Sequence, residues 1–598
     1  MAWKPRNPGE QQCTFSWMMM IVVMALLGFL AGTMPARAEE PQIFGRPVAI
    51  VMSDDGDSVL IANRDLSAIT VIDSHTMEVR MIEGPWSGIV DAAIVPKLKY
   101  LIAVATMPPS LLSINTVPQS PDEPGTVALP ALPARVAVSL DGRFACVSMT
   151  WDHSVCLVPL TIDGHLDGDA LTRIPLSFPP RELLALPGQR FLVADAFGGH
   201  LVVVDAHPGS IVAAHELSGH HIGGMARKIW GSQILITHQR LSKVAESNRD
   251  DVHWGTLMQN GVTSIPEPDF FDTTQPISRN MRFRLLGDVG NGAADPAGIA
   301  AWDRGHFAVA VAGTNQIAFW HNSARVPLLV DVGLLPTRLV HFGPSKLLCV
   351  NTLDDTASLV DFSNGLRVEK VLGKQRTLET AEDRGEVAFY AAKLSHDGWM
   401  SCSSCHVDGH SPDLLADTLG DGRFGNPKRI PSLLNASVTG PWAWDGSKTS
   451  LEAQVRQTLE TTMHRDERSR ASASSDDDVA SDMSAYLHTL SPPPVPISTV
   501  EVEETALGAA IFRERACIKC HDPDKDFTSP QTYDVAVQDE TGTKLFNPPS
   551  LRGLRHRRTF FHDARFRSLD DLLQTHPDAP APGSVEDSSQ LKAFLMSL

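Results

Sequence analysis

The chain has 598 residues, too many for one hydrophobic core, so we expect several domains, or fewer where one of them is a large all-β unit. Its 43 glycines and 42 prolines, with only 6% aromatic residues, fit short strands and tight turns better than long helices. A formal net charge of −19 at pH 7 argues against binding to nucleic acid or anionic lipid and favours a basic protein partner.

The N-terminus has the features of an export signal. Lys4 and Arg6 precede the apolar run 17–30, and the sequence Ala-Arg-Ala at 36–38 is a small-x-small cleavage site. We therefore predict that residues 1–38 are a signal peptide for export to the periplasm. The alternative is an uncleaved membrane anchor, because the run is near the short limit of a spanning helix. No later segment of this kind occurs, so no stable membrane insertion is expected after processing.

A repeat of strand, turn, strand, loop and strand extends through the first part of the chain. Clear copies occupy 45–73, 134–160, 180–206, 295–320 and 335–362, and weaker copies occupy 88–115 and 222–260. Seven units spaced by about 40 to 46 residues are typical of propeller blades. We predict a seven-bladed, all-β propeller over 39–374, which resembles the bacterial YVTN-type propellers. The polar insertion 241–280 lacks the strand rhythm and is expected to be a long loop on one face.

The propeller histidines show no spacing typical of metal ligands. Examples are His220, His221, His238 and His253. We expect most of them to be structural or surface residues. The propeller itself is expected to be a docking or substrate-positioning platform.

The pattern becomes helical after residue 374. Helical spacing predicts helices over 379–394 and 476–490, and the proline-rich segment 492–496 predicts a stiff linker. The linker divides this part into two halves, 375–496 and 497–598.

Each half contains one Cys-x-x-Cys-His motif, at 402–406 and 517–521. In this motif the two thiols form thioethers to haem vinyl groups and the histidine is the proximal iron ligand. A zinc site would need four ligands in one cluster, and a disulfide would leave the paired histidines unexplained. We therefore predict two covalently bound haem c groups. The attachment and proximal residues are Cys402, Cys405, His406, Cys517, Cys520 and His521.

Four further cysteines have other interpretations. Cys13 belongs to the signal peptide, and Cys349 lies in an apolar strand and is expected in the core. Cys146 and Cys156 lie in consecutive strands of one blade. They form either a periplasmic disulfide or two buried free thiols, and the sequence leaves both alternatives open.

The segments around the two motifs resemble the bacterial di-haem cytochrome c peroxidase and MauG family. The resemblance rests on 384–406 and 430–454 in the first half and on 507–521 and 548–576 in the second. It implies two mainly α, cytochrome c-like domains that carry two haems. Within this resemblance, a calcium ion is a further cofactor candidate.

The resemblance also implies roles for single residues. Trp444, in a Trp-Asp-Gly sequence, matches the family's tryptophan between the haems, and packing is its alternative role. The distal ligand of the second haem lies fourteen residues after His562, which is His576, where the family has methionine or tyrosine. The family's blocking histidine for the first haem falls at Gly422, and His410 is the only early candidate. The first haem is therefore expected to be open to peroxide.

Cleavage of peroxide requires a group that moves a proton between its two oxygens. The family has an acid or amide after its Trp-Asp-Gly segment, and the matching stretch offers Glu460 first and His464 second. Both can also be ordinary solvated helix residues.

Three functions are compatible with these features. The first is reduction of hydrogen peroxide at the first haem, with electrons from a small periplasmic cytochrome c or cupredoxin relayed through the second haem. The second is a MauG-like oxidase that modifies a protein partner held by the propeller. The third is a plain electron-transfer cytochrome, which the open first haem and Trp444 disfavour.

Overall fold

The computed structural model describes residues 42–117, 123–228, 230–303, 305–321, 324–465, 475–495, 502–539, 541–576 and 583–598. The predicted signal peptide, residues 1–38, lies outside these residues. Phe44–Leu598 form one compact unit, which contains every described helix and strand. None of the described helices combines the length and the apolar character needed to cross a membrane.

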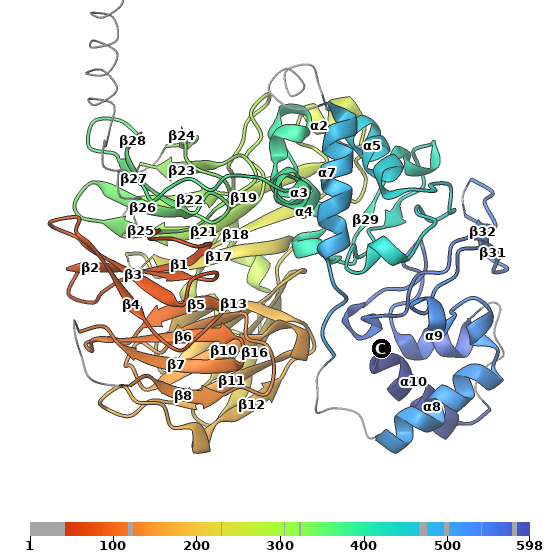
Figure 1. Ribbon diagram of the computed structural model, residues 1–598, viewed down its shortest axis with the longest axis horizontal. Coiled ribbons are helices and arrows are strands. Elements are labelled where there is room, and N and C mark those ends of the chain that lie inside the picture. Colours follow the sequence, from red (N-terminus) through yellow and green to blue (C-terminus); the bar gives the residue numbers. More distant parts are fainter. Residues whose placement is uncertain are drawn as a thin grey trace, which may run out of the picture. The chain divides into compact units, whose positions relative to one another are not determined.

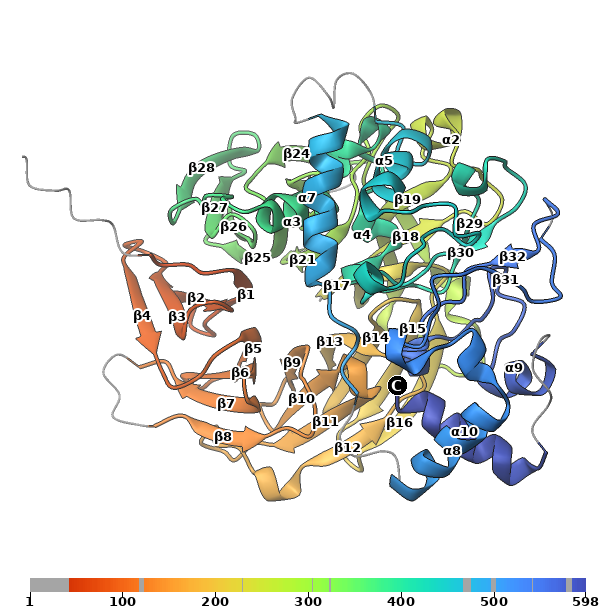
Figure 2. The same ribbon diagram turned by 45° about the vertical axis from the view of Figure 1, so that its right-hand side comes forward.

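Seven four-stranded antiparallel sheets follow one another in the described part of the chain and form the blades of a propeller (Figure 2). The predicted seven-bladed propeller is therefore confirmed. Blade by blade, the strands are β1 (Pro47–Met52), β2 (Ser58–Asn63), β3 (Ala68–Asp73) and β4 (Val79–Glu83); β5 (Ile89–Ile94), β6 (Tyr100–Thr106), β7 (Pro109–Asn115) and β8 (Gly125–Ala128); β9 (Arg135–Val138), β10 (Phe144–Met149), β11 (Ser154–Pro159) and β12 (Thr172–Pro175); β13 (Pro180–Leu186), β14 (Arg190–Asp195), β15 (His200–Asp205) and β16 (Ser210–Glu216); β17 (His220–Lys228), β18 (Gln233–Leu241), β19 (Met258–Pro266) and β20 (Arg282–Leu285); β21 (Pro296–Ala301), β22 (Phe307–Val311), β23 (Gln316–Trp320) and β24 (Leu328–Asp331); and β25 (Pro336–Phe342), β26 (Lys346–Asn351), β27 (Thr356–Asp361) and β28 (Arg367–Leu372).

The ring closes by contact between the first and last blades. The first strands of neighbouring blades contact one another around the ring, and β1 contacts β25. These first strands therefore line the propeller axis. There, Glu182 accepts hydrogen bonds from Arg135 at 3.1 Å and from Arg338 at 2.7 Å, so one buried carboxylate joins three blades. The apolar core lies between adjacent sheets, because each propeller cluster combines side chains of two neighbouring blades.

The insertion 241–280 contradicts the expectation of a long loop without strands. It contains the helix α2 (Arg249–His253) and the strand β19, which pairs with β18 over nine residues. The sequence does not show this strand clearly, because polar residues interrupt the apolar alternation expected of a strand. Asn260 accepts a hydrogen bond from Gln239 and Thr263 bonds His238, at 2.7 Å each, so buried polar pairs replace the expected apolar alternation.

Helices and short turns make up most of the described chain after β28. The helices predicted near 379–394 and 476–490 are present as α3 and α7. The described elements are α3 (Ala381–Tyr390), α4 (Cys402–Cys405), β29 (Leu415–Ala416), β30 (Lys428–Arg429), α5 (Leu451–Thr461), α7 (Asp476–Thr489), α8 (Val502–Glu514), β31 (Tyr533–Asp534), β32 (Leu545–Phe546), α9 (Leu569–Thr575) and α10 (Val585–Met596).

Both halves of this region contain a pair of helices in close contact, α3 with α7 and α8 with α10 (Figure 1). A glycine allows each approach. A Cβ atom on Gly385 would lie 2.0 Å from the Asp482 carbonyl oxygen, and one on Gly508 would lie 2.0 Å from that of Gln590. Since real Cβ atoms do not approach a backbone oxygen so closely, both positions require glycine. Each half therefore contains a helix pair of the same kind. The boundary between the halves, at residues 496 and 497, stays a prediction.

Candidate functional site

The first cysteine motif forms the short helix α4, which is capped by its own serines. The Ser401 amide donates to the Ser404 hydroxyl at 2.9 Å, and the Ser404 amide donates to the Ser401 hydroxyl at 3.3 Å. His406 follows, with its Nδ1 2.9 Å from the Pro431 carbonyl oxygen. Because a carbonyl only accepts, Nδ1 carries the proton and Nε2 keeps the lone pair that binds a metal. Burial lowers the pKa of His406 to about 4, so the ring is neutral at pH 7.

The second motif has the same imidazole arrangement in a looser setting. Its cysteines lie in and after a 3-10 turn, Cys517–Lys519. His521 places Nδ1 3.1 Å from the Phe527 carbonyl oxygen, which again leaves Nε2 for a metal. Burial lowers the pKa of His521 to about 4. Ile518, between the two cysteines, is 39% exposed, so this motif lies nearer to solvent.

The first motif is anchored on the propeller by a buried carboxylate. Asp295, which immediately precedes β21, accepts hydrogen bonds from the hydroxyls of both Ser401 and Ser404 at 2.5 Å. The Ser404 carbonyl lies 2.9 Å from Nε2 of His220. The expected structural role of His220 is thus confirmed. The sequence did not reveal the Asp295 anchor, because this aspartate looks like an ordinary turn residue of the repeat.

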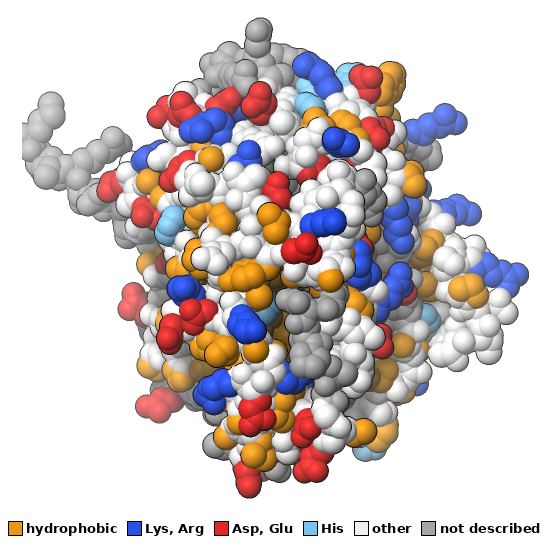
Figure 3. Space-filling model, turned by 90° about the vertical axis from the view of Figure 1, so that its right-hand side faces the viewer, with side chains coloured by type: hydrophobic (Ala, Val, Ile, Leu, Met, Phe, Trp, Pro, Cys, Tyr) orange, Lys and Arg blue, Asp and Glu red, His pale blue; other side chains and the backbone are white. Residues whose placement is uncertain are grey.

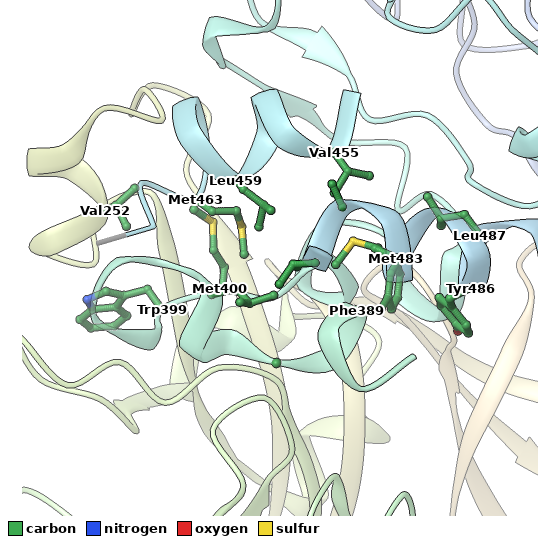
Figure 4. Packing of buried hydrophobic residues seen from close by; sticks show 14 of the residues in the cluster. Val252, Phe389, Trp399, Met400, Val455, Leu459, Met463, Met483, Tyr486 and Leu487 are labelled. Atoms are coloured by element: carbon green, nitrogen blue, oxygen red, sulfur yellow. The ribbon is translucent and has the colours of Figure 1, made fainter. Parts of the chain in front are cut away.

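A large pocket, partly open to solvent, lies beside His406. One wall consists of apolar side chains from α3, α5 and α7, including Phe389, Leu459 and Met483 (Figure 4). Residues of the second half, such as Phe546, line another part of the wall. Both halves therefore enclose the space next to the first predicted proximal ligand.

Cationic side chains also line this pocket. Three of them, Lys428, Arg429 and Arg552, form salt bridges with aspartates, whereas Arg557 forms none within the described part of the chain. Lys428, Arg429, Arg552 and Arg557 belong to its lining. Burial and the charge of Arg429 lower the pKa of Arg557 to about 9. Among the described residues, no carboxylate forms a salt bridge with the Arg557 guanidinium. The Arg557 guanidinium donates to the Ser550 carbonyl at 2.8 Å, and a haem propionate would provide the anionic partner that a buried guanidinium favours. The apolar walls, the thiols and these cations together fit a haem c.

Trp444 lies at the junction between the two halves. Its Nε1 donates to the Arg429 carbonyl at 3.1 Å, and its own carbonyl accepts from the Asn547 amide at 2.9 Å. Its ring centre is 6.4 Å from that of His562. Trp444 therefore contacts residues of both halves and lines the pocket. Its role as an electron bridge stays a prediction.

His576 lies near the second predicted proximal ligand. It follows α9, and its ring centre is 5.7 Å from that of Phe561. The pKa of His521 is lowered mainly by burial and also by the nearby His576, so the two imidazoles share one environment. Ligation of the second haem by both histidines stays a prediction.

The structure does not bring the two proposed proton-moving residues to the described pocket lining. Glu460 is exposed near the end of α5, and Nε2 of His464 lies 2.6 Å from the carbonyl of Ser247 in the propeller insertion. Gln454, which the sequence interpretation missed, does line the pocket. Its Oε1 is buried and has no hydrogen-bond partner among the described residues. The helical periodicity could have shown that Glu460 faces away from the pocket, because it lies on the side of α5 opposite the buried Leu451.

His410 lies outside the pocket lining. Its Nδ1 lies 3.0 Å from the Ser432 hydroxyl, and its ring contacts Trp151 and Phe197 of the propeller. Among the described lining residues, His406 is the single histidine. The open distal side of the first haem stays a prediction.

Outside the two motifs, the described cysteines are free thiols, and Cys13 lies outside the described residues. Cys146 and Cys156 are buried, and they pair with Leu157 and Val147 rather than with each other across β10 and β11. The disulfide alternative is therefore wrong for this pair. Cys349 is a free, buried core residue, as expected. The calcium ion stays a prediction.

Known proteins resemble two regions of the chain. The di-haem cytochrome c peroxidase family matches residues 380–491. A methylamine utilization protein MauG of Methylorubrum extorquens is 28% identical over 258 residues, which are 36% of this chain and 72% of that protein. A cytochrome c551 peroxidase of Nitrosomonas europaea is 23% identical over 274 residues, 38% of this chain and 82% of that protein.

Among solved structures, hydrazine synthase of Kuenenia stuttgartiensis is similar over 55% of this chain and 99% of its own, at 16% identity and a TM-score of 0.47. Within this chain, the region similar to the di-haem cytochrome c peroxidase family, residues 380–491, follows a seven-bladed β-propeller.

Proposed function

We propose that this protein is an exported, periplasmic di-haem c-type oxidoreductase that reduces hydrogen peroxide at the first haem. Two electrons and two protons convert one peroxide to two waters, and the electrons reach the first haem through the second. The pocket beside His406 is the observation that carries this proposal. Its walls are mainly apolar with a few charged side chains, it is partly open to solvent, and no second histidine lines it among the described residues.

When bound, the haems supply an iron centre that binds and reduces peroxide and a second centre that passes electrons. His406 is held by the Pro431 carbonyl with Nε2 free, so its ring is oriented before it binds iron. The buried Gln454 Oε1, which has no partner among the described residues, could accept a hydrogen bond from a peroxide O–H in the pocket. Glu460 and His464 remain candidates for proton transfer, although each would have to act from outside the described lining.

Electrons are proposed to enter at the second motif, which lies nearer to solvent than the first. A small donor such as a cytochrome c or cupredoxin would dock there. The face drawn in Figure 3 carries interspersed acidic and basic side chains. Docking on that face would therefore rely on local complementarity rather than on one broad patch of a single charge sign.

The test mixes the purified ferric protein with peroxide in a stopped-flow instrument, with and without a reduced donor cytochrome. A peroxidase oxidises the donor rapidly over many turnovers, consuming two donor electrons per peroxide. Failure of peroxide to change the absorbance of either haem, with no donor oxidation, would rule the proposal out.

A MauG-like oxidase acting on a protein partner is the second candidate, because the relative with the higher identity is a MauG protein. The propeller would then hold the protein substrate. The same experiment separates the two functions. An oxidised state that persists after peroxide addition, with slow donor turnover, would favour the oxidase.

A further inference from the structure

Three metal-binding side chains converge where the propeller insertion meets the turn that precedes the first cysteine motif. His253 ends α2 in the insertion, and His396 and Asp397 lie in that turn. Nδ1 of His253 is 2.6 Å from Oδ2 of Asp397, and Nε2 of His396 is 3.4 Å from the same oxygen. All three ligand atoms lie within 4.8 Å of one another. Residues 144 positions apart thus direct two imidazoles and one carboxylate to one point.

Apolar packing holds the two segments in place. Val252 and Trp399, which adjoin the cluster in the sequence, both belong to the buried core beside the first motif (Figure 4). The indole Nε1 of Trp399 also donates to the His253 carbonyl at 3.2 Å. The surrounding structure therefore places the three side chains close together even without a bound ion.

The spacing of the ligand atoms suits a tetrahedral transition-metal site. Bonds of about 2.0–2.1 Å to nitrogen and oxygen place the ligand atoms of a tetrahedral zinc ion about 3.3 Å apart. The separation of 3.4 Å between His396 and Asp397 is close to that value, whereas the 2.6 Å between His253 and Asp397 is a hydrogen-bond distance that an ion would have to widen. Two imidazole nitrogens and a carboxylate oxygen are ligands that zinc and neighbouring divalent metals accept.

Access to the cluster is also suitable for a metal. The carboxylate of Asp397 and the ring of His396 are buried, whereas the His253 side chain is 38% exposed. An ion can enter from the side of His253, and a water molecule can complete four ligands there. The simpler alternative is an ion pair between His253 and Asp397. Such a pair would not explain why the imidazole of His396 lies at the same point.

We propose that His253, His396 and Asp397 bind a divalent transition-metal ion of the zinc class. The ion would join the propeller insertion to the turn that leads into Cys402. This site is separate from both predicted haem irons and does not depend on the proposed peroxidase function.

The test uses the holoprotein, treated with a chelator, incubated with zinc chloride and desalted. Zinc and iron are then measured by plasma mass spectrometry. We expect one retained zinc per chain and a higher melting temperature with zinc than with chelator. His253→Gln should lose the zinc, because the amide still donates to Asp397 but is a poor metal ligand.

His215→Ala is the matched control. His215 is a half-buried propeller histidine that bonds the Phe270 carbonyl at 2.9 Å, and its loss should leave the zinc content unchanged. Circular dichroism of each variant verifies folding. Absence of retained zinc in the wild type, and equally of copper and cobalt in parallel samples, would overturn the proposal. Wild-type zinc content in His253→Gln would overturn it as well.

Discussion

The two cysteine motifs share one imidazole arrangement but differ in their surroundings. The first is buried against the propeller, where Asp295 and His220 bind its serines. The second is a 3-10 turn with no buried residue, and Ile518 is exposed. A rigid, enclosed site suits chemistry on a small substrate, whereas an exposed one suits exchange of electrons with another protein. The difference therefore agrees with the proposed division of tasks between two motifs with the same pattern.

Loss of each proximal histidine gives the strongest test of this division. His406→Ala should abolish reaction with peroxide while the second haem keeps its spectrum, because the cysteines that attach both haems remain. His521→Ala should instead preserve peroxide binding and stop electron delivery. Stopped-flow absorbance with peroxide alone and with reduced donor measures both effects. Peroxide reactivity that survives in His406→Ala would reverse the assignment.

His576→Ala tests whether the second haem has two histidine ligands. Removal of the distal imidazole should convert this haem from low-spin to high-spin, since Gln574 and Thr575 next to it are poor ligands. Electron paramagnetic resonance of the ferric protein reports the change. Gln574→Ala, on the same exposed helix end, is the control and should stay low-spin. A low-spin second haem in His576→Ala would identify another ligand.

Trp444→Phe tests the connection between the two sites. If the indole carries charge between the haems, transfer should slow by tenfold or more (roughly 1.4 kcal/mol in barrier) while peroxide still binds. A tryptophan that only packs would cost about 1–3 kcal/mol of stability through lost volume and would leave transfer normal. Inter-haem transfer and melting temperature are measured on the same sample. Normal transfer with lowered stability would refute the bridge.

Asp295→Ala should weaken the anchored site selectively. Two hydrogen bonds to a buried carboxylate contribute about 3 kcal/mol together, so urea should unfold the first haem domain at a lower concentration. Asp522→Ala, at the exposed turn after the second motif, should cost less than about 1 kcal/mol. Haem absorbance during the titration reports each site. Equal effects of the two substitutions would show that the propeller contact does not stabilise the first motif.

The last predicted effect is a gradual loss of stability in acid. Burial lowers the pKa of His153 to about 4 and that of His410 to about 3, and Nε2 of His153 bonds Nδ1 of His556 at 2.9 Å. An unfolded histidine titrates near pH 6.5, so the unfolded chain takes up protons first as pH falls. Stability should therefore be complete above pH 6.5 and fall towards pH 4 by about 1 kcal/mol per unit for each histidine.

Denaturant midpoints measured between pH 7 and pH 4.5 check this slope. His153→Gln does not titrate and should flatten it. An unchanged slope in that variant would mean that His153 is protonated in the folded protein.

Local pattern was sufficient for much of the architecture and of the predicted haem chemistry. The seven blades follow from alternating strands and turns, and α3 and α7 follow from helical spacing, because neighbouring residues determine both periodicities. The Cys-x-x-Cys-His motifs identify their histidines from five adjacent residues. In each of them, the structure adds the carbonyl that orients the ring.

Tertiary contacts decided what local pattern could not. β19 was missed because its buried polar residues find partners only across the sheet. Likewise, Asp295 of the propeller binds serines more than 100 positions away in the first cysteine motif. His253 of the propeller insertion lies next to His396 and Asp397, which precede that motif. A side chain's role at such places depends on which distant backbone approaches it, and that approach is set by packing of whole domains rather than by the residues next to it.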